Sequence, residues 1–301
     1  MNKNFFLLIV MIFLNALVTS CHDELDGEPL SNLGPNVNFF NDLVECEIVL
    51  NGVYDKMADH YQQNFIYMSD HGSHVATMLF NNPLLNLYAW YTFDNTDRFV
   101  RDTWGTAYEV IYGSNLVINR VGQLETDDDL LKNRIIAEAK FLRALAYFNL
   151  VRFYGDVPLH LEELNDFENS DSVNKPRTST SIIYEAIIDD LIFAEEHLYF
   201  ASWVSDDSKP SYQIDDLGRA TIGAAKGLLA KVYLTRASFP ERNLDSYQLA
   251  FDKAKEIIDD ANYIIDPDYY NLNSLEGKTS QEWMFQIQYS VLGQQTSNWG
   301  G

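Results

Sequence analysis

Apolar and polar positions follow a helical period most clearly between residues 135 and 154. Apolar side chains recur there in alternating steps of three and four, which is typical of one face of an amphipathic helix. They are Ile135, Ala139, Leu142, Ala146, Leu150 and Phe153. Gly155 can take the left-handed conformation that ends many helices, and Pro158 prevents the helix from continuing. The pattern predicts a helix that stops abruptly at a Gly-Asp-Val-Pro sequence.

Other segments have similar periodicity and are also predicted to be helices. They are residues 44–57, 104–121, 181–198, 219–237 and 247–260. The first should turn Val44, Ile48 and Val49 to one apolar side. The helix at 219–237 is apolar on almost every side, which predicts a position inside the protein.

The order of these segments predicts the fold class. Neighbouring helices are expected to form antiparallel pairs, 104–121 with 134–154 and 181–198 with 219–238, whose second member also faces 247–260. Their Tyr and Ala positions are a degenerate version of the tetratricopeptide pattern. Residues 283–290 alternate apolar and polar side chains and are predicted to form a strand. The chain is therefore expected to be mainly α, a tetratricopeptide-like scaffold of helical pairs with long irregular loops and a minor strand element.

The region from 59 to 100 lacks a sustained helical period. It contains Gly72, Pro83, several Asn and many aromatic residues. A loop of this length inside a compact domain is usually functional. We refer to residues 59–100 as the aromatic excursion.

The N-terminus has the features of an export signal. An apolar run from Phe5 to Val18 follows Lys3 and is too short for a comfortable membrane span. The sequence Val18-Thr19-Ser20-Cys21 is typical of a bacterial lipobox, in which Cys21 becomes the lipidated N-terminus; an ordinary secretory signal with a nearby Cys is the alternative. The predicted organisation is a lipoprotein signal peptide at 1–20, a lipidated Cys and acidic tether at 21–43, and a helical domain at 44–301.

Charge and cysteine content limit which ligands and which disulfide bonds the chain can have. The formal net charge of −23 argues against binding nucleic acid, and against a basic patch that would hold anionic lipid headgroups. The chain has two Cys residues, so Cys46 has no disulfide partner once Cys21 is lipidated. Cys46 is expected to be a small, buried apolar residue.

A series of motifs resembles the SusD/RagB family. The motifs are Cys21–Asp26, Leu50–Tyr54, Trp104–Tyr108, Glu138–Leu159, Gly218–Thr221 and Ala224–Leu234. The resemblance implies a surface lipoprotein of Bacteroidetes, anchored in the outer membrane, that passes glycans and sometimes peptides to a SusC-like TonB-dependent porin. Members of this family usually continue well past a position like Gly301, so the C-terminal part of the family's length is expected to be missing.

A sugar-binding site needs flat aromatic faces and side chains that form directional hydrogen bonds with hydroxyl groups. The aromatic excursion and the C-terminal residues supply both. The candidate ligand-binding residues are Asp70, Asn81, Trp90, Tyr91, Arg98, Asn298 and Trp299. The alternative for Trp90 and Tyr91 is packing that anchors the loop, because aromatic residues are more often buried than functional.

The sequence offers little support for catalysis or for a cofactor. Asp70-His71-Gly72-Ser73-His74 has a common spacing without a third His nearby, so a turn is expected rather than a metal site. The stretch Asp94–Asp97 could hold calcium, but nothing fixes its ligand geometry, and no cofactor is predicted. Nucleophile-elbow and phosphate-loop motifs are absent, which favours a binding protein over an enzyme.

Four functions stay open at this point. Glycan capture is favoured, and peptide capture is the alternative because an acidic surface attracts basic peptides. A glycosidase is the third possibility and would need a catalytic pair of carboxylates. The chain has 44 Asp and Glu residues, so neighbouring acidic residues in the sequence do not identify such a pair. A tetratricopeptide-like assembly scaffold without a ligand of its own is the fourth.

Overall fold

The computed structural model describes residues 40–73, 83–164, 173–204, 206–238, 240–272, 274 and 276–289. All of them belong to one unit, Phe39–Gly301. The predicted signal peptide and Cys21, the predicted lipidation site, lie outside the described residues. The long helices are α2 (Leu43–His60), α5 (Arg98–Gln123), α6 (Asp129–Tyr154), α8 (Thr180–His197), α9 (Ile222–Ala237) and α10 (Ser246–Asp260). The mainly helical prediction is confirmed.

Shorter elements fill the connections. They are α3 (Gln63–Ile66), the π-helical turn η1 (Tyr67–His71), α4 (Pro83–Ala89), the 3₁₀ turn η2 (Ile214–Asp216), α11 (Tyr269–Leu272) and the 3₁₀ turn η3 (Glu276–Thr279). Two short strands, β1 (Val157–Pro158) and β2 (Arg177–Thr178), pair antiparallel. Within the described residues, no helix is long and apolar enough to cross a membrane.

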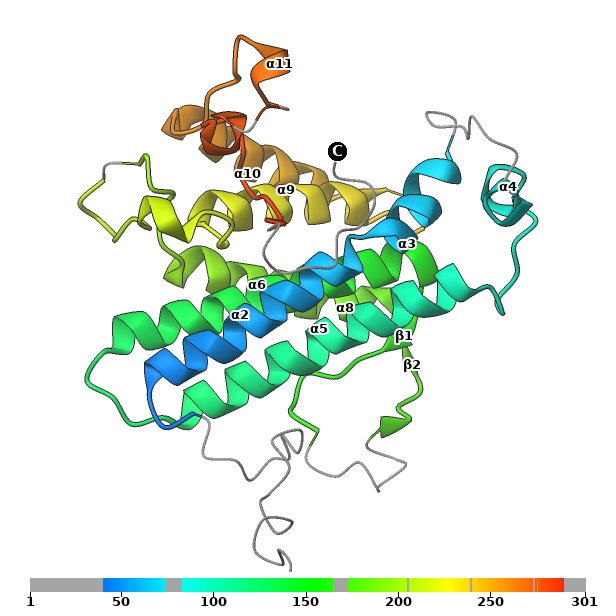
Figure 1. Ribbon diagram of the computed structural model, residues 1–301, viewed down its shortest axis with the longest axis horizontal. Coiled ribbons are helices and arrows are strands. Elements are labelled where there is room, and N and C mark those ends of the chain that lie inside the picture. Colours follow the sequence, from blue (N-terminus) through cyan, green and yellow to red (C-terminus); the bar gives the residue numbers. More distant parts are fainter. Residues whose placement is uncertain are drawn as a thin grey trace, which may run out of the picture. The chain divides into compact units, whose positions relative to one another are not determined.

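Helix α6 is the centre of the fold (Figure 1). It packs against α5, α8 and α2, while α9 packs against α8 and α10. The predicted pairs α5–α6, α8–α9 and α9–α10 are therefore all in contact. Every residue of α6 from Arg134 to Val151 except Lys140 is buried, including the charged residues Glu138 and Arg143.

Two predictions of helix orientation are wrong. Helix α9 buries Leu229 and Val232 but exposes Leu234, because it lies at one side of α6 and not inside the bundle. Helix α2 exposes Val44 and Ile48, at 65% and 56% of their surface. Its buried stripe contains Leu43, Cys46, Leu50, Val53 and Met57. The apolar residues of α2 lie on two faces, so the periodicity alone did not show which face α5 and α6 cover.

Cys46 is fully buried on this stripe, as predicted. Burial raises the pKa of its thiol to about 11, and the nearby Asp42 and Glu45 add to the shift. The thiol is therefore protonated and unreactive at neutral pH.

The Gly-Asp-Val-Pro junction connects α6 to α8. Gly155 has φ +69° and ψ −127°, a conformation that glycine adopts without strain. The side chain of Asp156 accepts a hydrogen bond of 3.0 Å from the backbone N–H of Thr180, the first residue of α8. Val157 is buried and pairs with Thr178 in the β1–β2 ladder. The residues that end α6 therefore also hold the start of α8.

The strand predicted at 283–290 is not observed. Residues 283–289 have no regular secondary structure, and within the described part of the chain they pair with no strand. Phe285 and Ile287 are partly buried and pack against the main core. Among the described residues, the loop at Gly218–Thr221 lies beside this segment, and the hydroxyl group of Thr221 donates to the carbonyl oxygen of Met284 at 3.4 Å, but the loop forms no backbone ladder with it.

Candidate functional site

The aromatic excursion is built on a small hydrophobic cluster of its own. Tyr67 from η1, Tyr88 from α4 and Phe99 from α5 are buried together, apart from the main core. The ring centroids of Tyr67 and Phe99 are 4.8 Å apart, and those of Tyr88 and Phe99 are 5.8 Å apart. The cluster joins segments that are up to 32 residues apart in the sequence, so it gives the excursion a folded base. We call it the satellite cluster.

A shared carboxylate fixes this base to α5. The hydroxyl group of Tyr88 donates a hydrogen bond to Oδ1 of Asp97. The same oxygen accepts a 2.8 Å hydrogen bond from the backbone N–H of Phe99 and so caps α5. Burial, followed by the contact with Asp97, raises the pKa of Tyr88. The hydroxyl therefore stays a donor at any physiological pH.

Trp90 and Tyr91 follow α4 and are exposed, with 68% and 61% of their surface accessible. Neither belongs to a hydrophobic core cluster of the described residues. Tyr91 has a positive φ of 54°, and its hydroxyl group donates a hydrogen bond to the carbonyl oxygen of Gly72. This bond ties the end of α4 to the turn after η1, and the aromatic rings stay open to solvent.

Asp70 and Arg98 lie beside the same cluster. Asp70 belongs to η1, which carries Tyr67, and Arg98 directly precedes Phe99 at the start of α5. Both side chains are exposed. The guanidinium of Arg98 lies 4.5 Å from the ring centroid of Phe99. The satellite cluster thus brings four of the predicted residues to its borders, while Asn81, Asn298 and Trp299 lie outside the described residues.

The carboxylates proposed for calcium are engaged in local hydrogen bonds. Asp94 accepts from the backbone N–H and the hydroxyl group of Thr96, at 2.7 and 2.6 Å. The bonds from the Thr96 hydroxyl and backbone lower the pKa of Asp94. Asp97 is occupied by Tyr88 and Phe99. The described residues contain no group of three or more His, Cys, Asp or Glu side chains suited to a metal ion.

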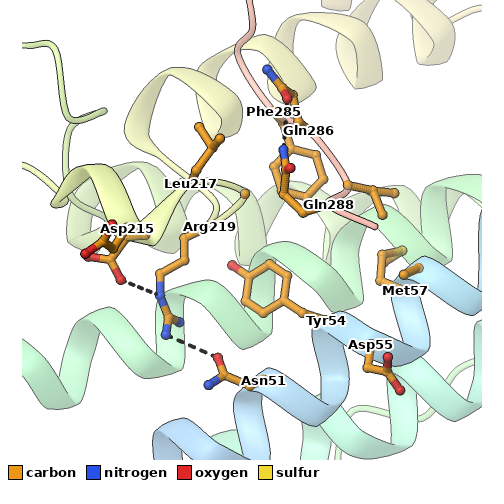
Figure 2. A pocket seen from close by; sticks show the side chains of 14 residues that line it. Asn51, Tyr54, Asp55, Met57, Asp215, Leu217, Arg219, Phe285, Gln286 and Gln288 are labelled. Atoms are coloured by element: carbon orange, nitrogen blue, oxygen red, sulfur yellow. Dashed lines mark hydrogen bonds and ion pairs between the residues drawn. The ribbon is translucent and has the colours of Figure 1, made fainter. Parts of the chain in front are cut away.

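A second feature, which the sequence did not predict, is a cavity of about 400 Å³ between α2, the segment around η2 and residues 285–288 (Figure 2). Its volume is in the usual range of ligand pockets. Its lining is rich in carboxylate and amide groups, which come from Asn51, Asp55, Asp215, Asp216, Gln286 and Gln288. We call it the acidic cavity. Because its walls lie up to 237 residues apart in the sequence, no local motif could have indicated it.

A buried charge network supports the floor of the acidic cavity. Glu138 of α6 is fully buried. The hydroxyl groups of Tyr54 and Tyr212 donate to it at 2.8 and 3.0 Å. The guanidinium groups of Arg134 and Arg219 donate to it at 2.6 and 3.0 Å. One carboxylate therefore joins α2, α6 and the segment after η2.

Arg219 connects this network to the cavity wall. It donates to Asp216 and to Asn51, in both cases at 3.1 Å (Figure 2). Burial is the largest single influence and would lower its pKa, but the charge and hydrogen bond of Glu138, together with Tyr54 and Tyr212, raise the pKa on balance. Arg219 is therefore a permanent cation that positions the wall, and it has no proton to give at neutral pH.

Comparison with known proteins places the chain in a family. Residues 25–234 match the SusD-like family model described as starch-binding and associating with the outer membrane. The chain belongs to the SusD-like family, which confirms the resemblance seen in the motifs. This is a family of binding proteins associated with the outer membrane.

Individual relatives agree with this assignment. SusD-like protein P2 of Formosa agariphila is 27% identical, over 96% of this chain and 54% of that protein. A solved structure described with a xylogluco-oligosaccharide has 26% identity and a TM-score of 0.67, over 83% of this chain and 47% of that chain. A laminarin binding SusD-like protein has 26% identity and a TM-score of 0.62, over 80% and 50%. The chain spans about half the length of the relatives it matches.

Proposed function

We propose that this protein is a lipid-anchored glycan-binding protein of the outer membrane. It captures oligosaccharide or polysaccharide at the cell surface through the aromatic excursion, and it passes the glycan to a SusC-like TonB-dependent transporter. Cys21 carries the lipid anchor. The family description and the two glycan-associated relatives support this role.

The observation that carries the proposal is the exposure of Trp90 and Tyr91 above a folded base. Exposed aromatic faces stack on the apolar faces of sugar rings, while Asp70 and Arg98 at the borders offer an acceptor and a donor for hydroxyl groups. The tie from Tyr91 to Gly72 fixes the turn around Tyr91 before ligand binds, which reduces the entropy lost on binding.

Isothermal titration calorimetry with a panel of glycans tests this role, with xyloglucan oligosaccharides and laminarin as the first probes. Each of Trp90→Ala and Tyr91→Ala should weaken binding by roughly three- to tenfold, because a stacked aromatic ring contributes about 0.5–1.5 kcal/mol. Tyr270→Ala is the matched control, since Tyr270 is 85% exposed and lies outside the excursion. Equal affinity of the wild type and both variants for every glycan would exclude the aromatic excursion as the glycan-binding site.

Two further measurements address anchoring and delivery. Mass spectrometry of the membrane fraction should find acyl chains on Cys21, and Cys21→Ala should release the protein. A SusC-like porin should co-purify with the wild type. Co-purification with unchanged uptake in the Trp90→Ala and Tyr91→Ala variants would favour an assembly scaffold instead.

Peptide capture is the second candidate. The specific observation in its favour is the acidity of the chain, with a net charge of −23, which attracts basic ligands at long range. Binding of basic peptides in the same calorimeter, with no glycan response, would establish this alternative.

A further inference from the structure

The turn after α4 brings Phe93 back onto Tyr88, a buried residue of that helix. The backbone N–H of Thr92 donates to the carbonyl oxygen of Leu87 at 2.8 Å, and the N–H of Tyr91 donates to that of Tyr88 at 3.2 Å. With the positive φ of Tyr91, these are the hydrogen bonds of a Schellman motif. Glycine is usual at this left-handed position, so the chain keeps an exposed tyrosine ring there at the cost of local backbone strain.

The ring of Phe93 lies flat on the ring of Tyr88. Their centroids are 4.7 Å apart, and the ring planes differ by only 12°. Tyr88 is 1% exposed, whereas Phe93 is 38% exposed. Because Tyr88 covers the inner face of Phe93, the exposed surface of Phe93 comes from the opposite face and the ring edge.

The plane of this stack is fixed from below. The hydroxyl group of Tyr88 donates to the same oxygen of Asp97 that caps α5, and the ring of Tyr88 also packs on Phe99 in the satellite cluster. Phe93 therefore offers a flat apolar face whose orientation is set before a ligand arrives. A sugar ring that stacks on such a face pays little for ordering the protein.

The charge beside this face indicates which sugars suit it. Asp94 follows Phe93 directly and is exposed. The hydrogen bonds from the Thr96 hydroxyl group and backbone hold its carboxylate and lower its pKa, so Asp94 is ionised at neutral pH. Within the described part of the chain, Asp94 forms no ion pair with a Lys or Arg side chain. A uronate or sulfate group next to Phe93 would be repelled by this charge.

We propose that Phe93 is a further binding residue of the glycan site, that Tyr88 and Asp97 hold its ring in one plane, and that it stacks on a neutral sugar ring. The inference rests on the proposed function and deepens it. It adds a third aromatic residue to Trp90 and Tyr91, and it names the substrate class as oligosaccharides without uronate or sulfate groups at this position.

The first test is calorimetry with the neutral glycan that binds the wild type most tightly. Phe93→Leu keeps an apolar side chain against Tyr88 but has no flat face, so affinity should fall roughly three- to tenfold. Phe93→Tyr keeps the ring and should stay within about twofold of the wild type. Phe251→Leu is the matched control, because Phe251 is 61% exposed on α10.

The outcomes of this test separate the two proposals. If Trp90→Ala weakens binding and Phe93→Leu does not, the inference is overturned and the proposed function stands. If the wild type binds no glycan, the proposed function fails and the inference fails with it. A loss in Phe93→Leu that Phe93→Tyr does not show supports stacking on the ring.

The second test asks whether Tyr88 acts through Phe93. Tyr88→Phe keeps the stack but frees it from Asp97, so glycan affinity should fall by about threefold, mainly through a less favourable entropy of binding. Asp97→Asn keeps an acceptor and a helix cap and should bind like the wild type. The Tyr88→Phe/Phe93→Leu double variant should bind no more weakly than Phe93→Leu alone. Additive losses would contradict a positioning role for Tyr88.

The third test compares the neutral glycan with an oligogalacturonate of the same length at low salt. The acidic oligosaccharide should bind about fivefold more weakly, and Asp94→Asn should reduce this difference by about twofold, because it removes the charge but keeps an acceptor for Thr96. Asp207→Asn is the charge-matched control, since Asp207 is exposed and lies outside the aromatic excursion. Equal binding of the two oligosaccharides, or no effect of Asp94→Asn, would contradict the assignment to neutral sugars.

Discussion

The core around α6 and the satellite cluster below Trp90 use polar groups in different ways. In the core, Glu138 receives two hydroxyl and two guanidinium donors, and Arg143 pairs with Asp190 at 2.7 Å while it also donates to Asn115. In the satellite cluster, three aromatic rings and one Tyr–Asp bond hold the base, and large rings remain exposed above it.

The first region stabilises the fold, whereas the second leaves aromatic side chains exposed for the binding that we propose. Partners of a buried charge must all be present, because a single unpaired charge in the core is costly. A region with few buried contacts has lower local stability and tolerates exposed aromatic groups. Binding residues are commonly placed on such loops above a rigid scaffold. Three changes can test whether the two regions behave independently.

The largest effect is expected from Glu138→Ala. The substitution leaves Arg134 and Arg219 partly unpaired in the core and removes the acceptor of Tyr54 and Tyr212. The free energy of unfolding should fall by about 3–5 kcal/mol, measured by urea denaturation. Glu256→Ala is the control, because its pairs with Lys226 and Lys253 are at the surface. A loss below about 1 kcal/mol would mean that the network contributes little.

The next effect is a pH dependence from His60, which is 1% exposed and contacts Thr106 and Asn149. Burial lowers its pKa to about 4, whereas an unfolded His titrates near 6.5. Between these values the unfolded chain binds the proton and the native chain does not. Stability is therefore full above pH 6.5 and should fall by roughly 3 kcal/mol as the pH drops toward 4.

Urea unfolding at pH 7, 6 and 5 measures this slope. Burial also lowers the pKa of His160, which adds a slope of the same sign. The comparison with His60→Gln isolates the contribution of His60, since this variant keeps a polar side chain that does not titrate. Parallel pH profiles of the wild type and the variant would exclude His60 as the source.

The smallest effect is expected in the excursion. Tyr88→Phe keeps the ring but removes the donor to Asp97, which should cost about 1 kcal/mol. Hydrogen exchange should become faster for amides between residues 63 and 99, with no change in α6. Tyr269→Phe, at an exposed position, is the control. Faster exchange throughout α6 would show that the two regions unfold together.

The sequence predicted the helices well because their periodicity is local, and the predicted stripe of Ile135, Ala139, Leu142, Ala146 and Leu150 is buried. It failed where an outcome depends on distant segments. The exposed Val44 and Ile48 are as apolar as the buried Leu43, and only the positions of α5 and α6 distinguish them. The acidic cavity combines three remote segments. Trp90 is exposed while Tyr88, two residues before it, is buried, and no single motif encodes this difference.

The Gly155–Asp156 junction has a consequence for how sequences of this type can change. Asp156 follows the end of α6 by two residues and accepts a hydrogen bond from the first N–H of α8, so the end of one helix is tied to the start of the other. An inserted residue here would move the carboxylate of Asp156 away from the first residue of α8 and would break this hydrogen bond. Length variation should therefore accumulate elsewhere in the connection between α6 and α8, and the Gly155–Asp156 pair should serve as a fixed point for aligning divergent sequences.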